Sequence, residues 1–135
     1  MKKFADTIRQ KQRFLITTHV QPDGDGIGSE IGLYHYLLNT GKKVWIFNPS
    51  PTPDKFDLLD PTKIIQFFKD EQELPQVDCV IIIDTNEIKM LGTLAPPIER
   101  LKVPVLFVDH HVKELQDTSN HLIDERSEER RVGKE

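Results

Sequence analysis

Three short apolar runs constrain this chain most, because each of them ends in side chains that carry chemistry. The runs cover residues 14–16, 80–83 and 105–108. Segments with helical periodicity separate them, so strands alternate with helices along the chain. This alternation predicts an α/β fold with a parallel sheet flanked by helices. Because the carboxyl ends of parallel strands meet at one edge, we expect the residues after the three runs to lie together.

The side chains that follow these runs are imidazoles and carboxylates. They are His19, Asp23 and Asp25 after the first run, Asp84 after the second, and Asp109, His110 and His111 at the third. Hard oxygen ligands mixed with imidazole, and without thiolate, suit Mn²⁺ or Mg²⁺ better than a structural zinc ion. Taken alone, the first stretch also fits a polar turn with an incidental histidine. The repetition after three strands favours a site.

These residues make the sequence similar to the DHH phosphoesterase family over about residues 10–124. The match comprises His19, Asp23 and Asp25, then Asp84, then the Asp109-His110-His111 motif, in the family's order. The resemblance implies hydrolysis of a phosphoester or phosphoanhydride with two metal ions, Mn²⁺ or alternatively Mg²⁺. By the family's pattern His19 and Asp23 hold one ion, Asp25 and His110 hold the other, and Asp84 bridges them.

The resemblance also implies roles for three further residues. Asp109 would orient a neighbouring histidine, and His111 would face the substrate phosphate, so both are candidate catalytic residues. Ser29 would donate a hydrogen bond to a metal-bound phosphate, or would instead cap the helix that begins near it.

The substrate is less constrained than the reaction type. The Gly26-Ile27-Gly28-Ser29 segment and the compact motif spacing look most like the nano-RNase and pAp-phosphatase branch, which implies a short oligonucleotide or pAp-like substrate. A manganese-dependent inorganic pyrophosphatase, a cyclic-dinucleotide phosphodiesterase and an inactive nucleotide-binding fragment remain alternatives. The family's fourth aspartate and C-terminal substrate domain would lie beyond the third motif. We therefore expect a C-terminally incomplete, inactive domain.

Composition narrows the partners. The net charge of -4 argues against a broad basic face for long duplex nucleic acid, whereas a short nucleotide neutralised by metal ions remains compatible. No apolar run approaches the roughly 20 residues of a membrane span, so no membrane association is expected. The single Cys79 excludes a disulfide framework and favours a cytoplasmic location. Association into a homodimer stays open.

The last ten residues differ from the rest of the chain. Residues 126–135 are mostly charged, with Val132 as the single apolar side chain. They resemble the translation of a widely used sequencing adapter more than a solvated C-terminal helix. We therefore predict a partial DHH phosphoesterase domain over residues 1–125 and a non-native tail over 126–135.

One helix matters for the site. Apolar residues at Ile27, Ile31, Tyr34 and Leu38 predict a helix over residues 27–39 that ends at Gly41. Gly28 and Gly32 lie one turn apart, and we expect them to let this helix pack closely on the sheet.

Overall fold

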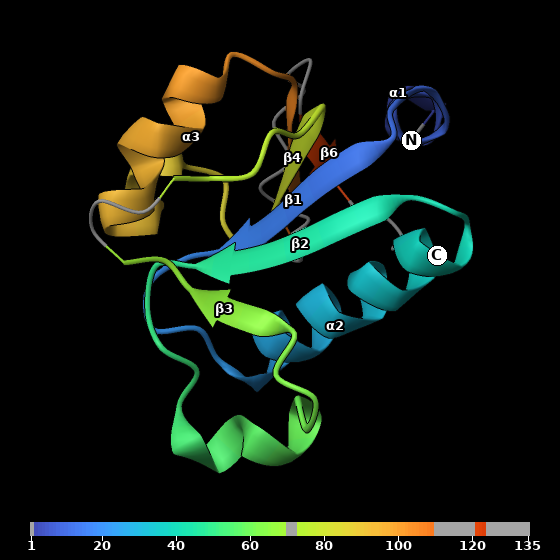
Figure 1. The fold of residues 1–135 in the computed structure, drawn as a ribbon. Coiled ribbons are helices and arrows are strands. Elements are labelled where there is room, and N and C mark those ends of the chain that lie inside the picture. The colour runs from blue at the N-terminus through green and yellow to red at the C-terminus, as the bar shows by residue number, and fades with distance from the viewer. Residues whose placement is uncertain (1, 70–72, 110–120, 124–135) are drawn as a thin grey trace.

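The computed structural model describes residues 2–69, 73–109 and 121–123. Its centre is a six-stranded, fully parallel sheet in the order β3-β2-β1-β4-β5-β6 (Figure 1). The strands are β1 (Arg13–Thr18), β2 (Lys43–Asn48), β3 (Ile65–Phe67), β4 (Cys79–Ile83), β5 (Val105–Asp109) and β6 (His121–Ile123). The predicted parallel α/β fold is confirmed. The predicted tail lies outside the described residues, and the division at residue 125 stays a prediction.

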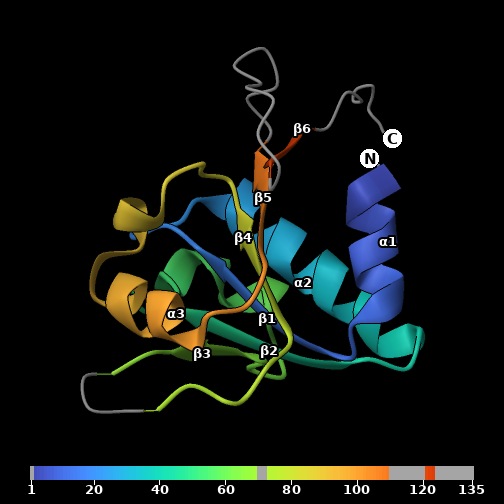
Figure 2. The same ribbon diagram turned by 90° about the horizontal axis from the view of Figure 1, so that it is seen from above.

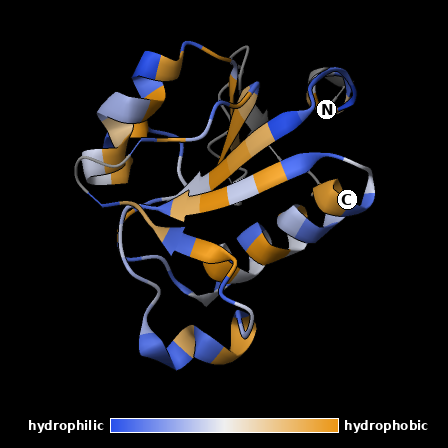
Figure 3. Ribbon diagram, in the orientation of Figure 1, coloured by the Kyte–Doolittle hydropathy of each residue, from blue (hydrophilic) through white to orange (hydrophobic). Residues whose placement is uncertain are grey.

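Helices cover both faces of the sheet (Figures 1 and 2). One face carries α1 (Lys2–Gln10) and α2 (Gly24–Asn39), and the other carries η2 (Ile88–Leu94) and α3 (Ala95–Leu101). Alternate residues of each strand point to opposite faces, so Ile81 packs beneath α1 and α2 while Val80 and Ile82 pack beneath η2 and α3. Figure 3 shows the resulting apolar strands beside helices of mixed hydropathy. None of the helices in the described segments is long and apolar enough to span a bilayer.

The helix α2 begins three residues earlier than the sequence pattern predicts. Asp23 caps it in an extended conformation, and its Oδ1 accepts a hydrogen bond from the Gly26 N–H at 2.9 Å. The cap stabilises two glycines in the first turn, where helical propensity alone is poor. The predicted end is confirmed, because Gly41 follows the helix with a φ of 89°.

The predicted packing of α2 was wrong in two respects. Gly28 and Gly32 are exposed, and a Cβ added to either would meet nothing within 4 Å, so neither allows a close approach to the sheet. Leu37 is fully buried, whereas the predicted Leu38 is 45% exposed. The helix is rotated slightly from the face that the spacing of its apolar residues suggested.

The sheet order places β1 and β4 side by side, although residues 19–78 separate them in sequence. Their register pairs Phe14 with Cys79 and Thr18 with Ile83. From β1 the chain adds β2 and β3 outward, and from β4 it adds β5 and β6 in the other direction. In open α/β sheets, ligands bind outside the carboxyl ends of the strands where this reversal occurs.

Candidate active site

The loop that follows β1 is held by backbone contacts from two sides. The Val20 N–H donates to the Met90 carbonyl at 3.0 Å, and the Gln21 N–H donates to Ser50 Oγ at 3.2 Å. Gln21 adopts a left-handed φ of 53°. Gly92 lies below, where a Cβ would approach Val20 Cγ1 to 3.1 Å. The loop therefore holds His19 and Asp23 at the carboxyl edge of the sheet.

Asp84 leaves β4 in an unusual backbone conformation. Its φ is 68°, a left-handed value that aspartate tolerates better than most other residues. The Asp84 N–H donates to the Val108 carbonyl at 2.7 Å, so the turn is tied to β5. The Asp84 side chain is only 9% exposed. A shielded carboxylate thus stands at the same sheet edge as Asp23, as the site hypothesis required.

His19 and Asp84 face each other across the β1–β4 pairing. His19 Nε2 lies 3.5 Å from Asp84 Oδ2, and His19 Nδ1 lies 2.7 Å from the Val20 carbonyl oxygen. Because a carbonyl oxygen only accepts, Nδ1 is the donor in the contact with Val20. Nε2 then faces a carboxylate oxygen at a distance that a proton or a cation between the two atoms would bridge.

Gly26 leaves a small space that three oxygen atoms border. A Cβ at Gly26 would lie 3.5 Å from Asp23 Oδ1, 3.5 Å from Thr18 Oγ1 and 3.6 Å from Asp84 Oδ2. Thr18 Oγ1 is oriented by a 2.7 Å hydrogen bond that it donates to the Ile83 carbonyl. Residues from β1, α2 and the end of β4 therefore converge on one buried glycine.

The remaining predicted site residues are placed less completely. Asp25 is exposed on the first turn of α2, and Ser29 follows in the second turn. The capping interpretation of Ser29 was wrong, because Asp23 caps the helix. Asp109 ends β5, next to β4 in the sheet. His110 and His111 lie outside the described residues. Within the described ranges, no group of three or more His, Cys, Asp or Glu side chains is placed to hold a metal ion. The assignment of metal ligands stays a prediction.

Residues 13–131 match the family described as "DHH family, N-terminal domain". The chain belongs to the DHH family. The domain is also similar to two curated proteins named "Bifunctional oligoribonuclease and PAP phosphatase NrnA". The protein from Thermus thermophilus is 30% identical over 118 residues, which is 81% of this chain and 31% of the relative. The protein from Mycoplasma genitalium is 27% identical over 121 residues, 89% of this chain and 37% of the relative.

A solved structure supports the same fold. An exopolyphosphatase-related protein from Bacteroides fragilis superposes with a TM-score of 0.76 at 27% identity, covering 90% of this chain and 36% of the other. The DHH domain described here thus spans about a third of the length of these relatives.

The donor types at this sheet edge are those that a hard divalent cation takes, although the described side chains are not placed as a set of three ligands. His19 donates its Nδ1–H to a backbone carbonyl, which is the arrangement that metal-ligating histidines commonly show, and it directs Nε2 toward Asp84. Asp23 uses Oδ1 to cap α2, so Oδ2 remains for a cation. The oxygen-lined space at Gly26 adds a donor set of the kind that Mn²⁺ and Mg²⁺ prefer.

Sequence reasoning missed a buried polar pair between α2 and the end of β2. Asn48 Nδ2 donates to Glu30 Oε1 at 2.9 Å, and both side chains are fully buried. Glu30 Oε2 and Asn48 Oδ1 have no hydrogen-bond partner in the described part of the chain. Burial raises the pKa of Glu30 to about 8, the Asn48 hydrogen bond lowers it, and the Asp60 charge raises it further. The available sequence signal for the burial of Glu30 was its position directly before the apolar Ile31 on the predicted helix.

Thr18 and Gly26 were also missed as parts of the site. Thr18 immediately precedes His19, and Gly26 follows Asp25, so both lie inside the stretch that the pattern singled out. Their importance depends on the approach of Asp84 from β4, which only the sheet order establishes.

Proposed function

We propose that this domain is the metal-binding part of a phosphoesterase that hydrolyses short oligonucleotides or pAp-like nucleotides. The observation that carries the proposal is the approach of His19 and Asp84 to 3.5 Å beside the oxygen-lined space at Gly26. Membership in the DHH family and the printed names of the two curated relatives support this substrate class. Because the chain spans about a third of the length of those relatives, hydrolysis of such substrates by this protein is itself part of the proposal.

In this proposal the carboxyl edge of the sheet would hold two Mn²⁺ ions, or Mg²⁺ in their place. The ligands of one ion would be His19 and Asp23, those of the other would be Asp25 and His110, and Asp84 would serve both. When bound, such ions would supply an activated water and stabilise charge on the attacking and leaving oxygens. Asp109 would orient a neighbouring histidine, His111 would contact the phosphate, and Ser29 would donate a hydrogen bond to it.

The described residues contribute positioning to this reaction. The left-handed backbone at Asp84 and its hydrogen bond to Val108 fix the carboxylate before any ligand arrives. The Nδ1 hydrogen bond to Val20 fixes the ring plane of His19. Thr18 is held by the Ile83 carbonyl, so its oxygen borders the same space. Prior placement of this kind lowers the reorganisation that phosphoryl transfer would otherwise need.

The experiment combines binding with hydrolysis. Mn²⁺ affinity is measured by calorimetry on the 135-residue chain, and phosphate or mononucleotide release from pAp and a dinucleotide is measured with Mn²⁺. A version extended by the downstream sequence of the parent gene is assayed in parallel. We expect the 135-residue chain to bind Mn²⁺ with little turnover, and the extended protein to hydrolyse the substrates. Absence of Mn²⁺ binding would contradict the proposal. Full turnover by an extended protein in which His19 and Asp84 are replaced would also contradict it.

Phosphoanhydride hydrolysis is the second candidate. The solved neighbour is titled an exopolyphosphatase-related protein, and the same oxygen-rich edge would serve a pyrophosphate substrate. Parallel assays with pyrophosphate and pAp on the extended protein separate the two candidates by their ratio of kcat/KM.

A further inference from the structure

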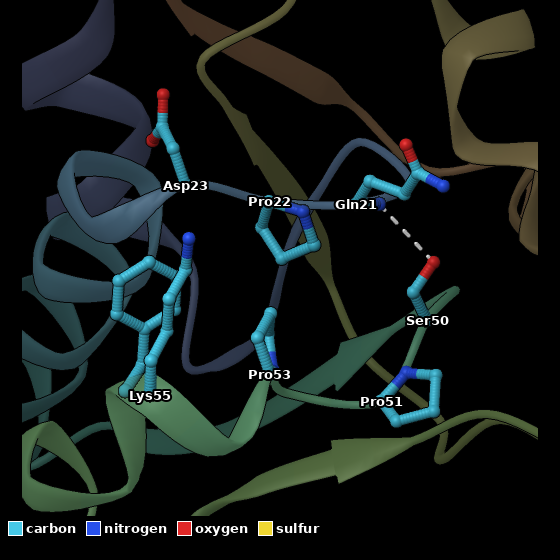
Figure 4. A pocket seen from close by; sticks show the side chains of 8 residues that line it. Gln21, Pro22, Asp23, Ser50, Pro51, Pro53 and Lys55 are labelled. Carbon is cyan, nitrogen blue, oxygen red and sulfur yellow. Dashed lines mark hydrogen bonds between the residues drawn. The ribbon is translucent and has the colours of Figure 1, made fainter.

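A pocket of about 570 Å³ includes Asp23 in its lining. Two segments far apart in sequence line it: residues 21–23, which lead into α2, and residues 50–56, which follow β2 (Figure 4). Asp23 belongs both to this lining and to the oxygen-lined space at Gly26. A molecule in the pocket would therefore extend to the candidate reaction centre.

The walls of the pocket are held before any ligand binds. Pro22, Pro51 and Pro53 restrict the backbone on both sides. Ser50 Oγ accepts the Gln21 N–H at 3.2 Å and so joins the two segments. Phe56, in η1 (Asp54–Leu59), packs on the start of α2, where a Cβ at Gly24 would lie 3.2 Å from its Cε1. A pocket with fixed walls loses little entropy on binding.

The chemistry of the lining is apolar and aromatic with few charges. Phe56 and the prolines supply flat apolar surfaces, and Ser50 retains its own O–H to donate. The Lys55 ammonium lies over the Phe56 ring, 5.2 Å from its centroid, and its chain extends along the Asp23 side of the pocket (Figure 4). A base that stacks on this face of Phe56 would displace the ammonium toward the attached phosphate. Among the described lining residues Lys55 is the single cation and Asp23 the single anion. A polyphosphate would need several cations here, whereas an aromatic base with one phosphate matches the lining.

We propose that this pocket binds the nucleoside of the substrate, with the base against Phe56 and the prolines and Lys55 near the attached phosphate. The proposal rests on the proposed function, because the phosphate then lies at Asp23. The pocket volume falls within the range of roughly 300–1,000 Å³ that is common for small-molecule sites. The pocket would let the enzyme distinguish nucleotides from inorganic phosphates within this domain.

The test is binding without metal, measured by NMR titration of the ¹⁵N-labelled 135-residue chain. The probes are adenosine, ribose and tripolyphosphate, with AMP as a fourth. We expect adenosine to shift the amides of residues 50–56, and ribose to bind at least about tenfold more weakly, because it lacks a base to stack. Tripolyphosphate binding more tightly than adenosine, or no shift in this segment, would overturn the proposal.

Five variants sharpen the test. Phe56→Leu should weaken adenosine binding about tenfold while keeping apolar volume, and Gly24→Ala should weaken it by displacing the ring. Gly28→Ala, whose Cβ meets nothing within 4 Å, is the control for the helix. Lys55→Gln should lower the affinity for AMP relative to that for adenosine about threefold, and Lys43→Gln at the other sheet edge should leave this ratio unchanged. Spectra of each variant confirm folding. Unchanged adenosine binding in folded Phe56→Leu would contradict the proposal.

The outcomes separate this inference from the proposed function. Hydrolysis of pAp by the extended protein together with no adenosine contact at residues 50–56 removes the nucleoside pocket and leaves the phosphoesterase. Adenosine binding that Phe56→Leu weakens, in a protein that neither binds Mn²⁺ nor hydrolyses pAp, supports the pocket and removes the proposed reaction.

Discussion

The two edges of the parallel sheet treat their carboxylates in opposite ways. At the amino edge, Asp78 accepts hydrogen bonds from the Gln12 N–H at 3.1 Å, the Arg13 N–H at 2.9 Å and Arg13 Nη2 at 3.0 Å. The Arg13 guanidinium, followed by the two backbone N–H groups, lowers the pKa of Asp78 to about 2. That carboxylate is neutralised by the fold itself.

At the carboxyl edge two carboxylates instead lie around one buried glycine. Asp23 Oδ1 and Asp84 Oδ2 both border Gly26, and Asp84 faces an imidazole whose other nitrogen already donates to Val20. Two backbone positions there, Gln21 and Asp84, have positive φ. Backbone strain and clustered ionisable groups are common at sites that a ligand completes. The amino edge thus neutralises its carboxylate within the fold, whereas the carboxyl edge has the features that the proposed function requires.

The largest expected effect is on activity, when one carboxylate at each edge is replaced in turn by asparagine. In the extended protein Asp84→Asn should lower kcat/KM for pAp by more than about a hundredfold, the loss that removing a mere orienting partner already reaches. Asparagine tolerates the left-handed φ, so the fold is retained. Asp78→Asn, the matched control, should keep activity and lower the thermal midpoint. Equal activity in the two variants would abolish the distinction between the edges.

The next effect concerns pH. The folded pKa of Asp78 is below its ordinary 3.8, so its contribution to stability is full above that value and is lost as pH falls toward 2. Glu30 is the reverse: its pKa is raised from 4.5 to about 8, so it increasingly destabilises the fold as pH rises between these values. Glu30→Gln should therefore remove a loss on the order of a few kcal/mol at pH 8.

Denaturant unfolding between pH 4 and pH 9 checks this prediction. Glu87→Gln, at an exposed position, is the control that changes the same charge without burial. A stability profile of Glu30→Gln that parallels the unchanged chain would show that Glu30 does not hold a proton in the folded state.

A smaller effect is expected from filling the oxygen-lined space. Gly26→Ala places a methyl group at ordinary contact distance from the three oxygens, so folding should be retained while Mn²⁺ affinity falls by about tenfold or more. Gly28→Ala alters the same helix without approaching the site and should leave the affinity unchanged. Calorimetric titration of both variants with Mn²⁺ tests this prediction. An equal loss of Mn²⁺ affinity in both variants would indicate an effect on the helix alone.

The smallest effect is expected away from both edges. Gly32 is exposed within α2, and a Cβ there meets nothing within 4 Å. Gly32→Ala should raise the free energy of unfolding by about 0.5–1 kcal/mol, since alanine loses less backbone entropy in a helix. Urea denaturation measures this gain. A loss of stability would contradict the exposed position of Gly32 and indicate that the outer face of α2 packs against another part of the protein.

The arrangement of the strand ends was predictable from the sequence, because the carboxyl ends of parallel strands meet at one edge of the sheet. The strands that contain the apolar runs 14–16, 80–83 and 105–108 lie parallel, so the residues that follow them, His19, Asp23 and Asp84 among them, share an edge. The space at Gly26, the burial of Glu30 and the pocket at Phe56 were not predictable in this way. They depend on how α2 rotates and on how residues 21–23 and 50–56 approach, and no local periodicity encodes either contact.

The seam between β1 and β4 gives the proposed cation a mechanical role. His19 and Asp23 belong to the half of the sheet built outward from β1, and Asp84 belongs to the half built outward from β4. An ion held by all three would fasten the two halves, so separating them would also require releasing the ion. Amide hydrogen exchange in the paired strands β1 and β4, whose register ends with Thr18 opposite Ile83, would then slow as manganese is added. Metal supply would thus govern how readily the two halves of the sheet separate, in addition to the proposed reaction.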